Sequence, residues 1–183
     1  MSTSGRDSYQ TPPALFERLD DMFGFNIDLA ATGENFVHPR YFTGPCAETE
    51  WCKCGLCAPL ANHRIFCNPP YSNLKPWIRR FQELSLRNSV VVAVLPADPT
   101  TEWWRMLTQT DGVCPDYILF TRKRVQFIHA QDCNCTSCKK GDRGANTKGT
   151  AIAIWARFGP TIVPRPRAMD AITTVWGWDY DGS

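Results

Sequence analysis

The sequence lacks several features that would quickly assign it to a functional class. No apolar run approaches the length needed to cross a membrane, and the first ten residues contain no apolar segment typical of a secretion signal. We therefore expect no membrane association and a cytoplasmic location. The net charge is only +2, so overall charge does not indicate nucleic-acid binding. Internal repeats and long low-complexity tracts are also absent, and we expect one domain over residues 1–183.

Cysteine, in contrast, is abundant, with 9 residues in this chain. Because a reducing cytoplasm disfavours disulfides, clustered thiols indicate a metal site. The segments CKCGLC and CNCTSC share the pattern C-x-C-x-x-C, and a C-x-x-C step lets two thiolates bind one tetrahedral zinc ion. An iron–sulfur cluster is one alternative. Exposed loops with incidental cysteines, or disulfides in a secreted protein, are others. The predicted ligands, for one zinc ion or two, are Cys52, Cys54, Cys57, Cys133, Cys135 and Cys138.

Short apolar runs alternate with amphipathic stretches, which predicts an α/β fold with a central, mostly parallel sheet and helices on both faces. The clearest strand is the continuous apolar run 89–97, as expected for a strand buried on both sides. The first helix is predicted to use Thr11 as its cap and to end at Gly24. The other predicted helices are 74–87 and 100–109, and the other predicted strands are 25–31, 64–67, 117–120, 124–128 and 150–158.

Polar or rigid residues follow three of the predicted strands. Asp28 lies near the end of one strand, Asn68 directly follows another, and Asp98 follows the third. In sheets of this type ligands bind outside the carboxyl ends of the strands. We therefore expect a ligand site at this edge of the sheet.

The segment Asn68-Pro69-Pro70-Tyr71 is suited to the methylation of a planar amine. An exocyclic amine on a nucleobase is a poor nucleophile, and two acceptors on its N–H groups can aim its lone pair. The Asn68 amide oxygen and the Pro69 carbonyl can supply them, because the prolines fix the backbone. Tyr71 offers a flat face for an extruded base. The alternative is an ordinary tight loop after a strand.

The surrounding segments resemble the phage-type, Dam-like DNA adenine-N6 methyltransferases over roughly residues 9–128 and again at the strand 150–156. The resemblance lies in YQTPPALFERLDDMFGFNIDLAATGENFVHPRYFT, FCNPPYSNLKPWI and VVVAVLPADPTTEWW. It implies a Rossmann-like methyltransferase fold, S-adenosylmethionine as methyl donor and DNA as substrate. By this resemblance the catalytic residues are Asn68, Pro69, Pro70 and Tyr71, and the cofactor-binding residues are Thr11, Pro12, Asp28, Ala30 and Ala31.

The chain departs from the family pattern in two ways. The glycine-rich signature of many methyltransferases is reduced to Gly33, and the cysteine-rich segments 46–57 and 133–138 look like insertions within the single domain. Lys139, Lys140, Arg143 and Lys148 follow the second segment, so a structural zinc ion there can shape a surface for phosphate contacts. Alternative functions are an RNA or protein-glutamine methyltransferase with the same motif, or an inactive, zinc-stabilised nucleic-acid-binding module.

Overall fold

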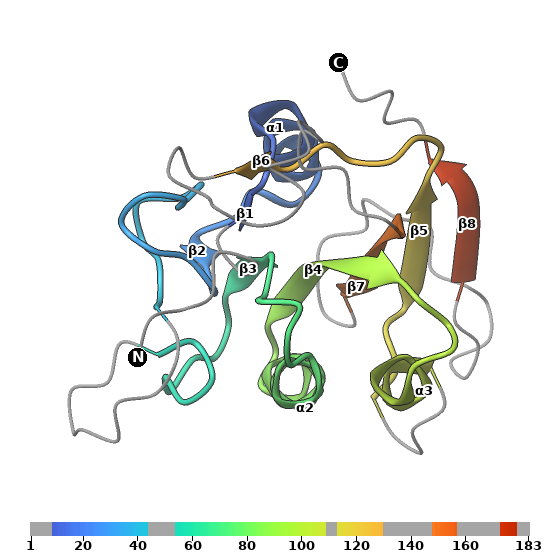
Figure 1. Cartoon of the computed structure of the whole chain (residues 1–183). Helices are drawn as coiled ribbons and strands as arrows, with labels where there is room; N and C mark the ends of the chain where they lie inside the picture. The colour runs from blue at the N-terminus through green and yellow to red at the C-terminus, as the bar shows by residue number, and fades with distance from the viewer. Residues whose placement is uncertain (1–8, 44–53, 109–112, 130–147, 157–172, 179–183) are drawn as a thin grey trace.

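The computed structural model describes residues 9–43, 54–108, 113–129, 148–156 and 173–178. A six-stranded sheet with the order β2-β3-β4-β7-β5-β8 forms its centre, and β1 and β6 form a separate two-stranded sheet (Figure 1). No helix in these ranges is long and apolar enough to cross a membrane. The elements are β1 Tyr9–Gln10, α1 Pro13–Phe23, β2 Ile27–Asp28, β3 Arg64–Cys67, α2 Lys75–Leu86, β4 Val90–Ala97, α3 Glu102–Thr108, β5 Tyr117–Thr121, β6 Ile128–His129, β7 Gly149–Trp155 and β8 Thr173–Trp178.

Strand directions in the large sheet are mostly the same, which confirms the predicted mostly parallel α/β sheet. β2, β3 and β4 pair in parallel, and β5 pairs in parallel with β8. β7 lies between β4 and β5 and runs antiparallel to both. All strands of this sheet except β7 therefore point their carboxyl ends toward the same edge.

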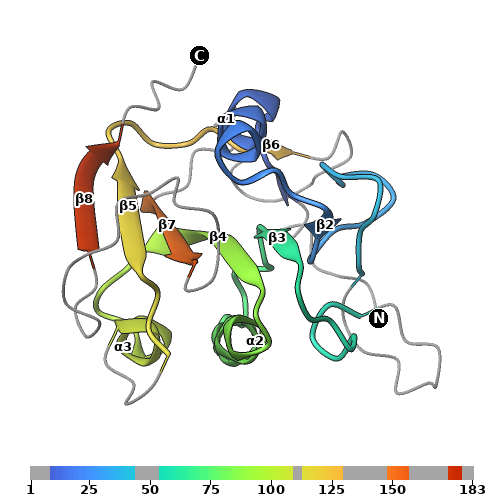
Figure 2. The ribbon, with the colours of Figure 1, turned by 180° about the vertical axis from the view of Figure 1, so that it is seen from behind.

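The two faces of the sheet are covered by different helices, as predicted. Side chains alternate along β3: Ile65 and Cys67 join the apolar cluster under α2 and α3, whereas Phe66 joins the cluster under α1. Figures 1 and 2 show α1 on one side of the sheet and α2 and α3 on the other. The central strands are thus buried on both faces, as their uninterrupted apolar sequence indicates.

The start of α1 and the length of β2 differ from the predictions. Thr11 is not the helix cap, because the amides of Leu15 and Phe16 donate to the Pro12 carbonyl and place the N-cap at Pro12, with no side-chain cap bond. Gly24 ends α1 as predicted, in the left-handed conformation with φ 58° and ψ 64°. The strand predicted over 25–31 forms only at Ile27–Asp28, since the chain turns away from the sheet after Leu29 donates to the Phe66 carbonyl at 2.9 Å.

Candidate active site

Strand pairing brings two predicted site residues to the same edge of the sheet. In the parallel β2–β3 pair, Asp28 is opposite Phe66, and Asn68 follows two residues later. β4 runs parallel to β3 and continues to Ala97, so Asp98 also lies beyond the carboxyl end of its strand. The backbone register of the parallel strands places these residues at one edge of the sheet.

Asp28 is a buried carboxylate, only 2% exposed, which organises the segment that follows it. Its Oδ2 accepts a hydrogen bond from the Val37 amide at 3.1 Å, and its Oδ1 accepts one from the Ala30 amide at 3.4 Å. Burial raises the pKa of Asp28 from 3.8 to about 6, although both backbone bonds and the nearby His38 act in the opposite direction. No Lys or Arg among the described residues forms an ion pair with this carboxylate.

The segment after Asp28 is held by local contacts that the sequence did not reveal. The Asn35 side chain accepts hydrogen bonds from the amide and the hydroxyl of Thr32, at 2.6 and 3.0 Å. The rings of Phe36 and Tyr41 stack with their centroids 5.0 Å apart. Predicted cofactor residues Ala30 and Ala31 lie in this segment, and the Ala31 amide donates to the Phe42 carbonyl at 2.9 Å.

The segment Asn68–Tyr71 folds back toward β4. The Tyr71 hydroxyl donates to the Val94 carbonyl at 3.3 Å, and burial, followed by the nearby Cys67, raises the pKa of that phenol. Asn68 is half-buried, and within the described ranges no residue forms a hydrogen bond with its side-chain amide. Pro69 is buried and Pro70 half-buried, so the backbone between the two polar side chains is fixed by rings and packing.

Phe127 links Tyr71 to the N-terminal segment, and the sequence pattern did not predict this contact. Its ring meets Tyr71 edge-on at 6.2 Å and Tyr9 at 6.4 Å. β1 and β6 pair antiparallel, with Gln10 opposite Ile128, and this places Thr11 after a strand that is anchored next to Phe127. Thr11 itself is 3% exposed.

Asp98 interacts with two residues near the same edge of the sheet. Its carboxylate pairs with Lys148 and accepts a hydrogen bond from the Thr100 hydroxyl at 2.7 Å. The bond from Lys148, and then that from Thr100, lowers the pKa of Asp98 below its usual value. Lys148, predicted to contact phosphate, thus interacts with Asp98; Lys139, Lys140 and Arg143 lie outside the described residues.

Comparison with known proteins matches residues 1–174 to the family model for DNA N-6-adenine-methyltransferase (Dam). The chain belongs to the Dam family. A DNA N-6-adenine-methyltransferase of Escherichia phage T1 is 28% identical over 102 residues, covering 54% of this chain and 40% of the phage protein. A second, of Haemophilus phage HP1 (strain HP1c1), is 27% identical over 128 residues and 69% of each chain. The match thus spans less than half of the T1 relative and about two thirds of the HP1 relative.

In this Dam-family chain, the structure describes only part of the predicted metal site. Cys54 and Cys57 lie in a turn packed against α2, whereas Cys52, Cys133, Cys135 and Cys138 lie outside the described residues. Within the described ranges no three His, Cys, Asp or Glu side chains gather as a metal site would require. Cys67 is fully buried, and burial raises the pKa of its thiol, as expected for a structural cysteine.

Proposed function

We propose that this protein transfers the methyl group of S-adenosylmethionine to the N6 amine of adenine in DNA, on a Rossmann-like methyltransferase fold. The observation that carries the proposal is the β2–β3 register, which sets Asp28 at the carboxyl end of β2 and the segment Asn68–Tyr71 just beyond the carboxyl end of the neighbouring parallel strand β3. Membership of the Dam family and the names of the two phage relatives support the same reaction.

Asp28 suits a cationic ligand. A carboxylate that is 2% exposed, with a pKa raised to about 6 and only backbone donors, is stabilised when a positive charge approaches it. When bound, S-adenosylmethionine would supply an electrophilic methyl group on a sulfonium centre. We assign Asp28 to its ammonium end, with Ala30, Ala31, Thr11 and Pro12 around it.

Asn68 and Pro69 are assigned to the target amine. The Asn68 Oδ1 and the Pro69 carbonyl would accept hydrogen bonds from the two N–H groups and aim the nitrogen lone pair at the methyl group. Asn68 and Pro69 would hold the amine while its nitrogen takes the methyl group and one N–H proton passes to solvent; the donor sulfur would leave as a neutral thioether. Pro70 fixes the backbone, and the Tyr71 ring, anchored through its hydroxyl to Val94, would stack against the extruded base.

Structural zinc is the second part of the proposal. The repeated C-x-C-x-x-C pattern supports it, with Cys52, Cys54, Cys57, Cys133, Cys135 and Cys138 as ligands for one ion or two. Cys54 and Cys57 lie at the two ends of one hydrogen-bonded turn, an arrangement that suits binding of a single ion.

Label transfer tests the reaction and separates it from the alternatives. The purified protein is incubated with methyl-tritiated S-adenosylmethionine and, in parallel, with DNA, RNA and protein extract. The proposal predicts label in DNA. Label confined to RNA or to protein would assign the site to a different substrate. If the protein binds DNA but neither binds S-adenosylmethionine nor transfers label, it is an inactive nucleic-acid-binding module.

A further inference from the structure

The turn Cys54–Ala58 is closed by its own backbone. The amides of Cys57 and Ala58 donate to the Cys54 carbonyl at 3.3 and 3.0 Å, so the two cysteines stand at the ends of one tight turn. The Leu56 amide points at the Cys54 sulfur, with a nitrogen–sulfur distance of 3.3 Å. A backbone N–H directed at the sulfur would donate to a metal-bound thiolate in this position.

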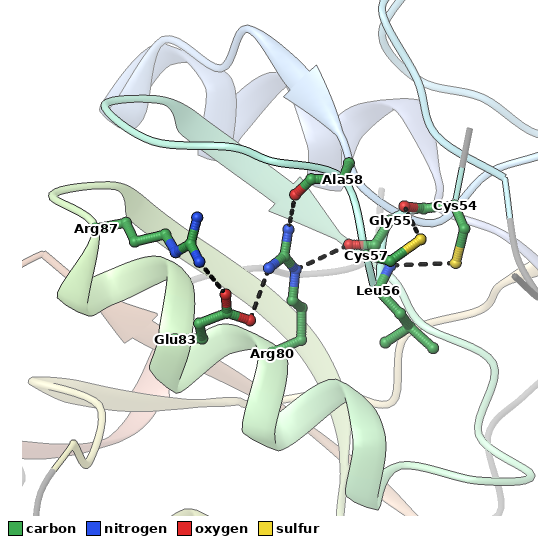
Figure 3. Close-up of polar contacts among 8 residues, drawn as sticks. All are labelled: Cys54, Gly55, Leu56, Cys57, Ala58, Arg80, Glu83 and Arg87. Carbon is green, nitrogen blue, oxygen red and sulfur yellow. Dashed lines mark hydrogen bonds and ion pairs between the residues drawn. The ribbon is translucent and has the colours of Figure 1, made fainter. Parts of the chain in front are cut away.

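Arg80 of α2 holds this turn from one side. Its side chain is only 4% exposed, and its Nε donates to the Gly55 carbonyl at 3.0 Å while Nη2 donates to the Ala58 carbonyl. Nη1 donates to Glu83 at 2.7 Å, so each guanidinium nitrogen has a partner (Figure 3). A buried cation is costly unless it is fully hydrogen-bonded, and only the planar guanidinium spans these acceptors together.

Gly55 holds the turn from the other side. A Cβ atom at this position would lie 2.0 Å from the Leu29 carbonyl oxygen, so the turn approaches the residue after Asp28 too closely for any side chain. The Gly55 amide also donates to the Thr43 carbonyl at 3.1 Å. The turn is therefore fixed between α2 and the two ends of the segment that follows β2.

The two sulfur atoms are left on the side of the turn away from the guanidinium (Figure 3). Cys54 is buried and Cys57 is exposed, and the Cys57 sulfur lies 3.7 Å from the Cys54 carbonyl oxygen. One cysteine of the pair is thus buried in the protein, and the other is exposed. Thiolates three residues apart supply two of the four ligands of a tetrahedral zinc-type ion.

We propose that Arg80 is a positioning residue for a two-thiolate half of a metal site at Cys54 and Cys57. The inference rests on the zinc part of the proposed function and extends it to a residue outside the cysteine pattern. On binding, each thiol loses its proton to solvent and forms a sulfur–metal bond, with no change of oxidation state. Because Arg80 fixes the turn before metal arrives, the cost of ordering these ligands on binding is reduced.

The matched pair Arg80→Lys and Arg87→Lys tests this role. Arg87 is exposed and pairs with the same Glu83 carboxylate at 2.8 Å, but it makes no bond to the turn. Titration of the metal-free full chain with Co²⁺, followed by the thiolate–cobalt charge-transfer absorption, measures affinity. We expect Arg80→Lys to weaken binding by on the order of tenfold or more, with the band restored at saturating Co²⁺, and Arg87→Lys to remain within about twofold of the wild type.

Each outcome of the titration is decisive. Equal Co²⁺ affinity in Arg80→Lys and the wild type would overturn the role of Arg80 while leaving zinc binding intact. A wild-type protein that shows no thiolate–cobalt band would overturn the metal site itself, whatever the methyl-transfer assay shows. If Arg80→Lys does not fold, Cys57→Ser replaces it: this side chain is exposed, and a band of unchanged intensity in that variant would contradict the proposed half-site.

Discussion

The strand-end site and the cysteine turn are positioned by different means. Asp28 and Asn68 reach the same edge because β2 and β3 pair in parallel, so the sheet register places both residues. The turn Cys54–Ala58 is placed by one buried side chain, Arg80, and by one close backbone approach at Gly55. Substitutions within the first site should change chemistry while sparing the fold, whereas substitutions around the turn should change stability and metal binding first.

Asn68→Ala is expected to have the largest effect. Losing one positioned acceptor should reduce methyl transfer on the order of a hundredfold or more while donor affinity stays near wild type. Single-turnover label transfer and calorimetry measure the two quantities. Asn73→Ala, in the same loop but exposed, is the control and should retain full activity. Near-normal methyl transfer by a folded Asn68→Ala protein would show that the reaction does not need the Asn68 side chain.

Gly55→Ala should destabilise the fold. Because the new methyl group would lie 2.0 Å from the Leu29 carbonyl, the turn or the end of β2 must move, at a cost of roughly 1–3 kcal/mol in free energy of unfolding. Denaturant unfolding measures this cost. Gly33→Ala is the control, since its Cβ would meet its nearest neighbour, the Tyr41 hydroxyl, at 3.7 Å. Equal stability of the two variants would show that the turn is free to shift.

Asp28 should make donor binding depend on pH. Burial raises the pKa of Asp28 from 3.8 to about 6 in the folded protein. Between these two pH values the folded state therefore binds more protons at this carboxyl than the unfolded state does. The contribution of Asp28 to the free energy of unfolding consequently falls as the pH rises from 3.8 to about 6. A cationic donor binds the ionised form, so its affinity should drop about tenfold between pH 7 and pH 5.

Calorimetry across this pH range checks the prediction. Asp28→Asn should bind the donor more weakly at pH 7 and show little pH dependence. Asp21→Asn, an exposed aspartate of α1, should behave as the wild type does. A pH profile unchanged by Asp28→Asn would place the donor's positive charge near a different residue.

Tyr71→Phe should have the smallest effect. It removes the hydrogen bond to the Val94 carbonyl but keeps the ring and its edge contact with Phe127. We expect a loss of about 1 kcal/mol in stability and a modest loss of methyl transfer, since stacking needs the ring alone. Thermal unfolding and label transfer check this. A loss of transfer as large as that of Asn68→Ala would assign the hydroxyl a chemical role.

The pattern of apolar and polar residues made much of this architecture predictable. The run 64–67 coincides with β3 and the run 89–97 with β4 to within one residue, because continuous apolar sequence bounded by polar residues is typical of buried parallel strands. Since ligands bind beyond the carboxyl ends of such strands, the sequence alone also indicates Asp28 and Asn68 as candidate site residues.

Contacts between distant segments could not be predicted in the same way. Arg80 lies three residues after Trp77 and four before Leu84, at the border of the apolar face of α2, but its charge is typical of an exposed side chain. Only the folded chain shows it buried against Gly55 and Ala58. The prediction of Thr11 as a helix cap was wrong because Pro12 took that position. The ring contacts of Phe127 with Tyr71 and Tyr9 join residues far apart in the sequence, and no local pattern indicates them.

We propose that the strand-end site methylates the N6 amine of adenine through Asn68. Mass spectrometry of nucleosides from DNA treated with the protein and S-adenosylmethionine tests it most directly. We expect N6-methyladenine after treatment with the wild type and with Asn73→Ala, and a yield lower by on the order of a hundredfold with Asn68→Ala. A methylated cytosine as the product, or the same yield of N6-methyladenine from Asn68→Ala, would contradict it.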